Sequence, residues 1–148
     1  MSALTTLSDD LSEAVAAAAR SVVTVHGGRR IGASGVVWRQ GVVVTADHAL
    51  EDDDDIGVTL ADGTRVAARV AGRDPSTDLA VLRVDAPNAP AATCAPPDEL
   101  RIGHVVMAVA RPGDYGAAAS MGVMSALSDA WTTWRGGPVV ARPRDGHD

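Results

Sequence analysis

The sequence has no lysine and no phenylalanine, and it has one cysteine among its 148 residues. A single cysteine, Cys94, excludes an internal disulfide and a cysteine-rich zinc site. The histidines and acidic residues show no metal-ligand spacing, so we expect no metal ion and no cofactor. With an aromatic content of 3%, valine, alanine, leucine and isoleucine have to fill the core.

Every basic residue is an arginine, and the formal net charge is −6 with an isoelectric point near 5.0. No basic stripe is present, which argues against nucleic acid as a partner. No run approaches the roughly 18 apolar residues of a membrane span. "AVAAAA" (14–19) is too short for a signal peptide and follows acidic residues. For the chain as given, the expected location is therefore the cytoplasm.

What the sequence does contain is enough apolar material, 46%, for one folded domain. Ser8 is a candidate N-cap for a helix that runs to about Arg20, with apolar residues at steps of four, four and three. Short β-branched segments follow, separated by turn residues, and predict six strands of a small barrel or sandwich. We expect these strands at 21–25, 35–39, 41–46, 56–60, 65–73 and 79–84.

The segment after the sixth strand changes character. Residues 85–99 are rich in proline and alanine, and their apolar residues show neither the helical nor the strand periodicity, so we expect a linker. Two further strands are expected at 104–110 and 117–127, with "RPGDYG" as the turn between them. The last stretch holds one more short strand and a polar end.

His48 ends the strand "GVVVTA" in the string "VVVTADHAL", and Asp78 precedes the strand "LAVLRV" 30 residues later (78 − 48). A histidine at a strand end is usually a surface or capping residue, and Asp78 suits a cap of the turn opened by Asp74-Pro75. Alternatively, an aspartate at a core edge needs a partner. A histidine ring N–H is such a partner, and the pair would act as a general base with its orienting carboxylate.

Three stretches of the chain resemble the protease half of the HtrA/Deg family of trypsin-like serine endopeptidases. "GASGVVWRQGVVVTADHAL" resembles the strands that lead to the family's catalytic histidine. "VTLADGTRVAARVAGRDPSTDLAVLRV" resembles the hairpin that leads to its catalytic aspartate. "LRIGHVVMAVARPGDYGAAASMGVMSAL" resembles the start of its second barrel.

The resemblance implies an all-β, chymotrypsin-like double β-barrel that acts on protein or peptide substrates. His48 would be the general base and Asp78 its orienter. The expected organisation is an N-terminal helix (1–20), a complete first barrel (21–84), a linker (85–103) and an incomplete second barrel (104–148). Because family members are exported, the resemblance also leaves export open.

The third catalytic group, a serine nucleophile, has no candidate in the sequence. The family carries it in a "GNSGGP"-like loop, whereas "TTWRGGPVV" holds Arg135 at that position. Ser34 lies in the glycine-rich "GASG" before the histidine, and the serines at 120, 125 and 128 lack a glycine elbow. We therefore expect a chain truncated before the nucleophile loop and inactive. The alternatives are a non-catalytic peptide-binding module, with pairing at an edge of the first barrel, or a pseudoprotease fragment.

One more motif follows the histidine. The acidic run "EDDDD" (51–55) is typical of a solvated loop, with a cation site as the alternative.

Overall fold

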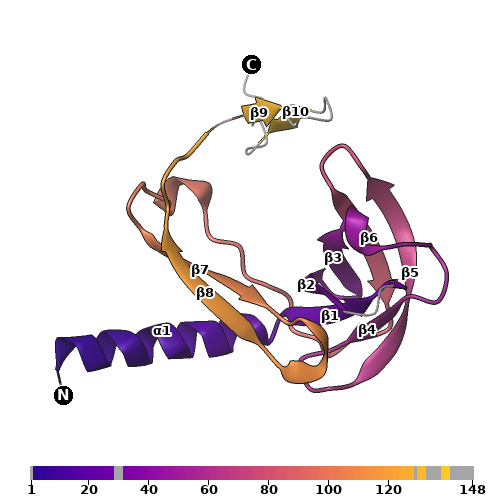
Figure 1. The fold of residues 1–148 in the computed structure, drawn as a ribbon, viewed down its shortest axis with the longest axis horizontal. Helices are drawn as coiled ribbons and strands as arrows, with labels where there is room; N and C mark the ends of the chain where they lie inside the picture. The colour runs from indigo at the N-terminus through magenta and orange to yellow at the C-terminus, as the bar shows by residue number, and fades with distance from the viewer. Residues whose placement is uncertain (1, 29–31, 129, 133–137, 141–148) are drawn as a thin grey trace.

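The computed structural model of the chain describes residues 2–28, 32–128, 130–132 and 138–140 (Figure 1). Helix α1 (Ala3–Ala19) extends away from a β-barrel, and a separate β-hairpin lies beside its C-terminal end. None of the described helices is long and apolar enough to cross a membrane.

Helix α1 begins earlier than the sequence predicted. Its N-cap is Ser2, whose hydroxyl accepts a hydrogen bond from the backbone N–H of Thr5 at 3.2 Å. The prediction of Ser8 as the cap is wrong: Ser8 lies within the helix, because nothing between the two serines breaks helical structure. The apolar stripe of α1 is only partly covered: Leu11 and Val15 are half-buried, whereas Leu7 is 52% exposed.

Six antiparallel strands close into a barrel in the order β1-β2-β3-β6-β5-β4. All six lie within two residues of their predicted ends. The β2–β3 hairpin turns through Gln40 and Gly41, and the β4–β5 hairpin turns through residues 60–64. Gly41 (φ 70°) and Gly63 (φ 87°) adopt left-handed backbone conformations that favour glycine. The strands are β1 (Val22–His26), β2 (Ala33–Arg39), β3 (Val42–Ala46), β4 (Gly57–Thr59), β5 (Arg65–Asp74) and β6 (Leu79–Val84).

The barrel interior is filled almost entirely by branched aliphatic side chains, as the lack of aromatic residues required. Its most buried members come from β1, β2, β3, β4 and β6, which is why the barrel can close around them. They are Val23, Val25, Val37, Val43, Val58 and Leu82, each no more than 1% exposed.

Beyond the barrel, β7 (Val105–Ala110) and β8 (Ala118–Val123) form a two-stranded antiparallel sheet. Residues 97–99 and 113–115 form 3-10 turns, and β9 (Ala130–Thr132) pairs with β10 (Pro138–Val140). β8 is exposed along its whole length and ends four residues before the predicted 127. This part of the chain is therefore a partial second sheet, as expected.

Arg111 joins this second sheet to the barrel and to α1. Its guanidinium donates hydrogen bonds to the carbonyl oxygens of Val22 (2.9 Å) and Ala19 (3.0 Å). The Thr24 hydroxyl in turn donates to the carbonyl oxygens of Arg111 (2.8 Å) and Gly113 (3.0 Å). These contacts fix one end of the β7–β8 hairpin against β1.

Candidate functional site

Strand β3 delivers His48 to one end of the barrel. Val43 and Thr45 are buried, and the Thr45 hydroxyl donates to the Ser34 carbonyl oxygen at 2.9 Å. After Ala46 the chain leaves the strand and forms the 3-10 turn η1 (Asp47–Ala49). The turn closes with the Leu50 N–H bonded to the Asp47 carbonyl oxygen at 3.1 Å. His48 thus sits in the middle of a hydrogen-bonded turn.

The loop between β5 and β6 presents Asp78 at the same end of the barrel. The Asp74 carboxylate begins this loop: it accepts hydrogen bonds from the Ser76 backbone N–H (3.0 Å) and from the Ser76 and Thr77 hydroxyls. These bonds, that of the Ser76 side chain first, hold the pKa of Asp74 below its usual value. Asp78 itself has a positive φ of 58°, which aspartate tolerates better than most residues.

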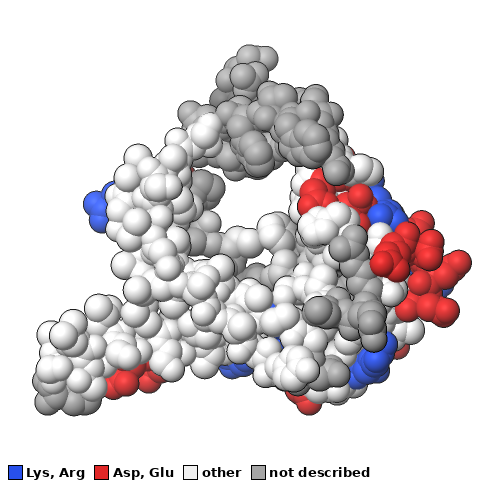
Figure 2. All heavy atoms as spheres, in the orientation of Figure 1, with Lys and Arg blue, Asp and Glu red and all other residues white. Residues whose placement is uncertain are grey.

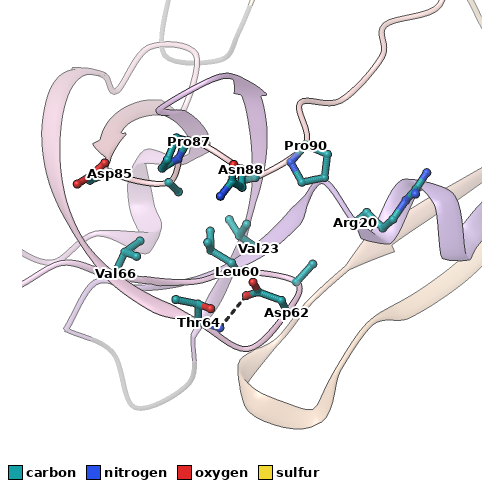
Figure 3. Close-up of a pocket in the computed structure, with 13 residues that line it drawn as sticks. Arg20, Val23, Leu60, Asp62, Thr64, Val66, Asp85, Pro87, Asn88 and Pro90 are labelled. Carbon is teal, nitrogen blue, oxygen red and sulfur yellow. Dashed lines mark hydrogen bonds between the residues drawn. The ribbon is translucent and has the colours of Figure 1, made fainter.

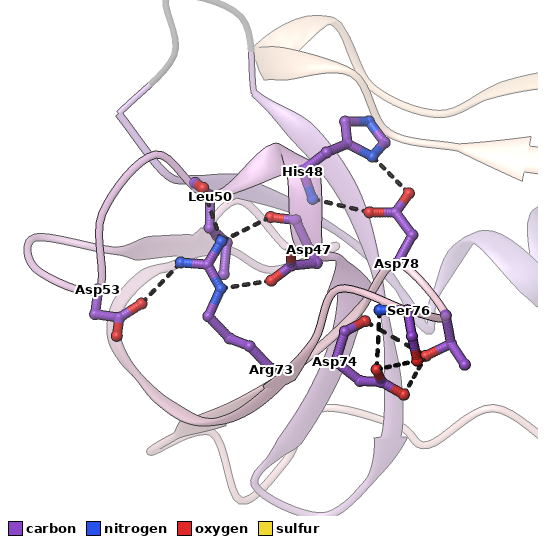
Figure 4. A network of polar contacts seen from close by, with 9 residues as sticks. Asp47, His48, Leu50, Asp53, Arg73, Asp74, Ser76 and Asp78 are labelled. Carbon is purple, nitrogen blue, oxygen red and sulfur yellow. Dashed lines mark hydrogen bonds and ion pairs between the residues drawn. The ribbon is translucent and has the colours of Figure 1, made fainter. Parts of the chain in front are cut away.

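His48 and Asp78 meet through two hydrogen bonds (Figure 4). The Nδ1 atom of His48 lies 2.6 Å from Oδ2 of Asp78, and the backbone N–H of His48 donates to Oδ1 at 2.9 Å. The backbone N–H of Asp47 also donates to the Asp78 carbonyl oxygen at 3.0 Å. The structure therefore brings together the two predicted site residues. Both are open to solvent, with side chains 64% and 43% exposed.

A second polar network lies directly beneath η1 (Figure 4). The Arg73 guanidinium donates to the Asp47 carboxylate at 2.5 Å and to the Asp53 carboxylate at 3.0 Å. It also donates to the carbonyl oxygens of Asp47 and Leu50, each at 3.1 Å. Sequence reasoning did not select Arg73 or Asp47. The only available signal was an acidic residue directly before the histidine in "TADHAL".

The acidic loop that follows η1 is exposed from Glu51 to Asp55. On the face that Figure 2 shows, acidic side chains gather on the barrel, whereas the β7–β8 side is almost free of charge. Within the described ranges, no three histidine, cysteine, aspartate or glutamate side chains are arranged to hold a metal ion.

The serines considered in the sequence have other places in the fold. The Ser34 hydroxyl accepts a hydrogen bond from the Arg111 backbone N–H at 2.9 Å, at the junction of barrel and second sheet. Ser120 lies in β8, opposite Ala108, and Ser125 and Ser128 follow that strand. Arg135, in the string that resembles the nucleophile loop, lies outside the described residues.

A cavity of about 510 Å³ opens at the other end of the barrel (Figure 3). Val23, Leu60 and Val66 contribute apolar walls, and the cavity also contacts the segment that follows β6, from Asp85 to Pro90. β6 begins beside Asp78 and ends at Val84, so this cavity and the His48–Asp78 pair lie at opposite ends of that strand.

Comparison with known proteins matches residues 33–146 to the trypsin-like peptidase domain. The chain is 42% identical over 91 residues to a "Probable periplasmic serine endoprotease DegP-like" of Chlamydia muridarum, covering 62% of this chain and 18% of that protein. A protein of the same description from Brucella suis is 37% identical over 116 residues, covering 77% and 21%. The chain thus spans about a fifth of the length of these curated relatives.

Among solved structures, the serine endoprotease of Yersinia pestis superposes with a TM-score of 0.71 at 30% identity, over 86% of this chain and 51% of that one. This match, the closed six-stranded barrel and the partial second sheet confirm the expected chymotrypsin-like fold class. The chain therefore belongs to the family of trypsin-like peptidase domains, as a member of the HtrA type.

Proposed function

We propose that His48 and Asp78 are the general base and its orienting carboxylate in a serine endopeptidase site for protein or peptide substrates. The observation that carries this proposal is the 2.6 Å contact between His48 Nδ1 and the Asp78 carboxylate. A carboxylate that accepts a hydrogen bond from Nδ1–H keeps this proton on Nδ1 and leaves the lone pair of Nε2 available to take a proton from a hydroxyl group. It also stabilises the imidazolium that forms when this proton arrives.

The Asp78 carboxylate also contacts the backbone of His48. One carboxylate oxygen holds the His48 ring, and the other holds the His48 backbone N–H at 2.9 Å. The same carboxylate therefore restrains both the ring and the backbone of the histidine. A base restrained in this way needs little reorganisation before it accepts a proton.

We further propose that this chain by itself does not hydrolyse peptide bonds. In "TTWRGGPVV" the position that matches the family's serine holds Arg135. A guanidinium group stays protonated and cannot attack a carbonyl carbon. Proteolysis needs a nucleophile together with oxyanion-hole donors. A base and an orienter without them would give a pseudoprotease.

A second candidate function, peptide binding without catalysis, is favoured by the exposed β7–β8 sheet. The six strands form a closed barrel without free edges, so the expectation that a peptide pairs with the first barrel does not fit this fold. β7 and β8, by contrast, pair only with each other among the described strands. An extended peptide could add to such an edge by main-chain hydrogen bonds.

The relatives also bear on the compartment. The curated proteins named above are described as periplasmic, and the expectation of a cytoplasmic chain finds no support in them. We propose that the present domain, like these relatives, works after export.

The base and orienter are tested by NMR on the ¹⁵N-labelled chain. We expect an exchangeable proton at low field, bonded to Nδ1 of His48, which disappears in His48→Ala and in Asp78→Asn. Asp78→Asn is the sharper variant because its side chain has nearly the same size but can donate to Nδ1. A wild-type spectrum without this proton would refute the pairing.

The missing nucleophile is tested by casein hydrolysis and by labelling with a fluorophosphonate probe. We expect the unmodified chain neither to hydrolyse casein nor to react with the probe, because loss of one catalytic group lowers the rate by several orders of magnitude. Arg135→Ser should also remain unlabelled, because only ten residues (135 − 125) separate Ser125 from that position. Ten residues are too few for the further strands that support the nucleophile loop in the family. Labelling of the unmodified chain that His48→Ala abolishes would show that another serine serves as nucleophile. Labelling only of Arg135→Ser would show a nucleophile loop disabled by one substitution.

A further inference from the structure

The side chain of Arg73 reaches the His48 turn because β5 contains a bulge. The register of β5 against β6 shifts between Val70 and Gly72, so that Val70 pairs with Leu82 but Arg73 pairs with Ala80. Leu82 and Ala80 are both 0% exposed and face the interior. Residues directly opposite each other in antiparallel strands lie on the same face of the sheet. The bulge therefore moves Arg73 to the interior face, at the end of the barrel.

At that end the guanidinium bridges both sides of His48. It donates to the carbonyl oxygen of Asp47, which precedes the histidine, and to that of Leu50, two residues after it. The planar fork of an arginine can make such bonds together, whereas a lysine offers a single ammonium group. Arg73 also stands five residues before Asp78 in the chain (78 − 73). The Arg73 side chain thus connects β5, the strand that leads to Asp78, with the η1 turn that contains His48.

Charge strengthens this connection. The Asp47 side chain is only 10% exposed in its contact with Arg73, and a carboxylate so far removed from water needs a cationic or hydrogen-bonding partner. Asp53, from the exposed acidic loop, adds a second carboxylate on the other side of the guanidinium. Their hydrogen bonds, that of Asp47 first, raise the pKa of Arg73 further above its usual range. The guanidinium stays charged, as that of arginine does in proteins generally.

We propose that Arg73 is a positioning residue: it holds the η1 turn so that the His48 ring faces the Asp78 carboxylate. The proposal rests on the base and orienter roles proposed above. It assigns to Arg73 no contact with substrate, since within the described part of the chain its side-chain hydrogen bonds go to residues 47, 50 and 53. Its effect reaches the histidine through the backbone on either side.

The test measures how fast the His48 Nδ1 proton exchanges with water in the ¹⁵N-labelled chain. In Arg73→Gln we expect exchange to be about tenfold faster or more, because the turn opens locally more often. The matched control is Arg69→Gln, an exposed arginine of the same strand outside the network of Figure 4. There the exchange rate should stay within about twofold of wild type.

A merely structural loss would loosen the whole barrel, so backbone amide exchange in β3 and β6 is recorded beside the histidine signal. We expect the amides of Val43 and Leu82 to keep their wild-type protection in Arg73→Gln. Arg73→Lys keeps the charge but not the fork, and we expect an exchange rate between wild type and Arg73→Gln. It decides the question if Arg73→Gln does not fold.

The outcomes separate this proposal from the one on which it rests. A histidine proton present in wild type, with unchanged exchange in folded Arg73→Gln, overturns the positioning role alone. Wild-type exchange in Arg73→Lys overturns it where only that variant folds. Faster exchange of the histidine proton and of the Val43 and Leu82 amides alike also overturns it. A proton absent from wild type overturns the His48–Asp78 pairing and the role of Arg73 together.

Discussion

Strands β3 and β6 pack together in the core through Val43 and Leu82, among other pairs, and truncation of Leu82 should lower the stability of the barrel. Leu82 in β6 pairs with Val43 in β3, and both side chains are 0% exposed. β3 ends just before His48 and β6 begins just after Asp78. Leu82→Ala removes packing beneath both strands without touching a polar group.

The expected loss follows from two contributions. Leucine has three more carbons than alanine, and about 0.8 kcal/mol for each gives a transfer term of about 2.4 kcal/mol. If about 40 Å³ stays unfilled, a cavity cost of about 24 cal/mol per Å³ adds about 1 kcal/mol. A closed barrel whose strands are all paired collapses poorly onto a void. We therefore expect Leu82→Ala to lower the free energy of unfolding by about 3–4 kcal/mol.

Leu79→Ala, in the same strand, is the matched control. Leu79 is 48% exposed, so the same truncation removes about half the transfer term and leaves no cavity, or about 1 kcal/mol. Urea unfolding followed by far-UV circular dichroism measures both variants, with equal slopes in urea as the check that midpoints report stability. A loss below about 1.5 kcal/mol for Leu82→Ala, or losses equal in the two variants, would refute this account of the core.

Two further predictions concern the strands and the loop around the site. Gly35→Ala should destabilise the barrel by about 1–3 kcal/mol, because the new Cβ would lie 2.9 Å from γ carbons of two core valines. Thermal melting measures this loss, and Gly72→Ala is the control because its new Cβ would have nothing within 4 Å. Hydrogen bonds from Ser76 and Thr77 hold the pKa of Asp74 below 3.8, so the ionised carboxylate stabilises the β5–β6 loop. This stabilisation should be fully present above pH 3.8 and should be lost as the pH falls through the lowered pKa. An acid titration of the Ser76 amide by NMR reports this loss, and Asp74→Asn should abolish the dependence; a midpoint at or above 3.8 in wild type would contradict it.

The N-terminal helix and the second sheet show where local patterns mislead. Ser8 satisfies the usual rule for an N-cap, yet Ser2 satisfies it earlier and the intervening residues are compatible with helix. The apolar residues of α1 lie on one face of the helix, but burial depends on what packs against that face, and Leu7 is 52% exposed. In β8 the apolar run predicted a strand up to residue 127, although regular pairing with β7 ends at Val123.

The sequence by itself determined the barrel strands and the two residues at their ends. β-Branched runs, interrupted by glycine turns, specify strands locally, and the motif around His48 and Asp78 identifies the family from short strings. Only the tertiary structure decided which groups surround that pair. The bulge at Val70–Gly72 shifts β5 by one residue and turns Arg73 inward, against the alternation that a regular strand would show. Such a shift depends on pairing with β6, a contact between distant segments, and no pattern local to β5 encodes it.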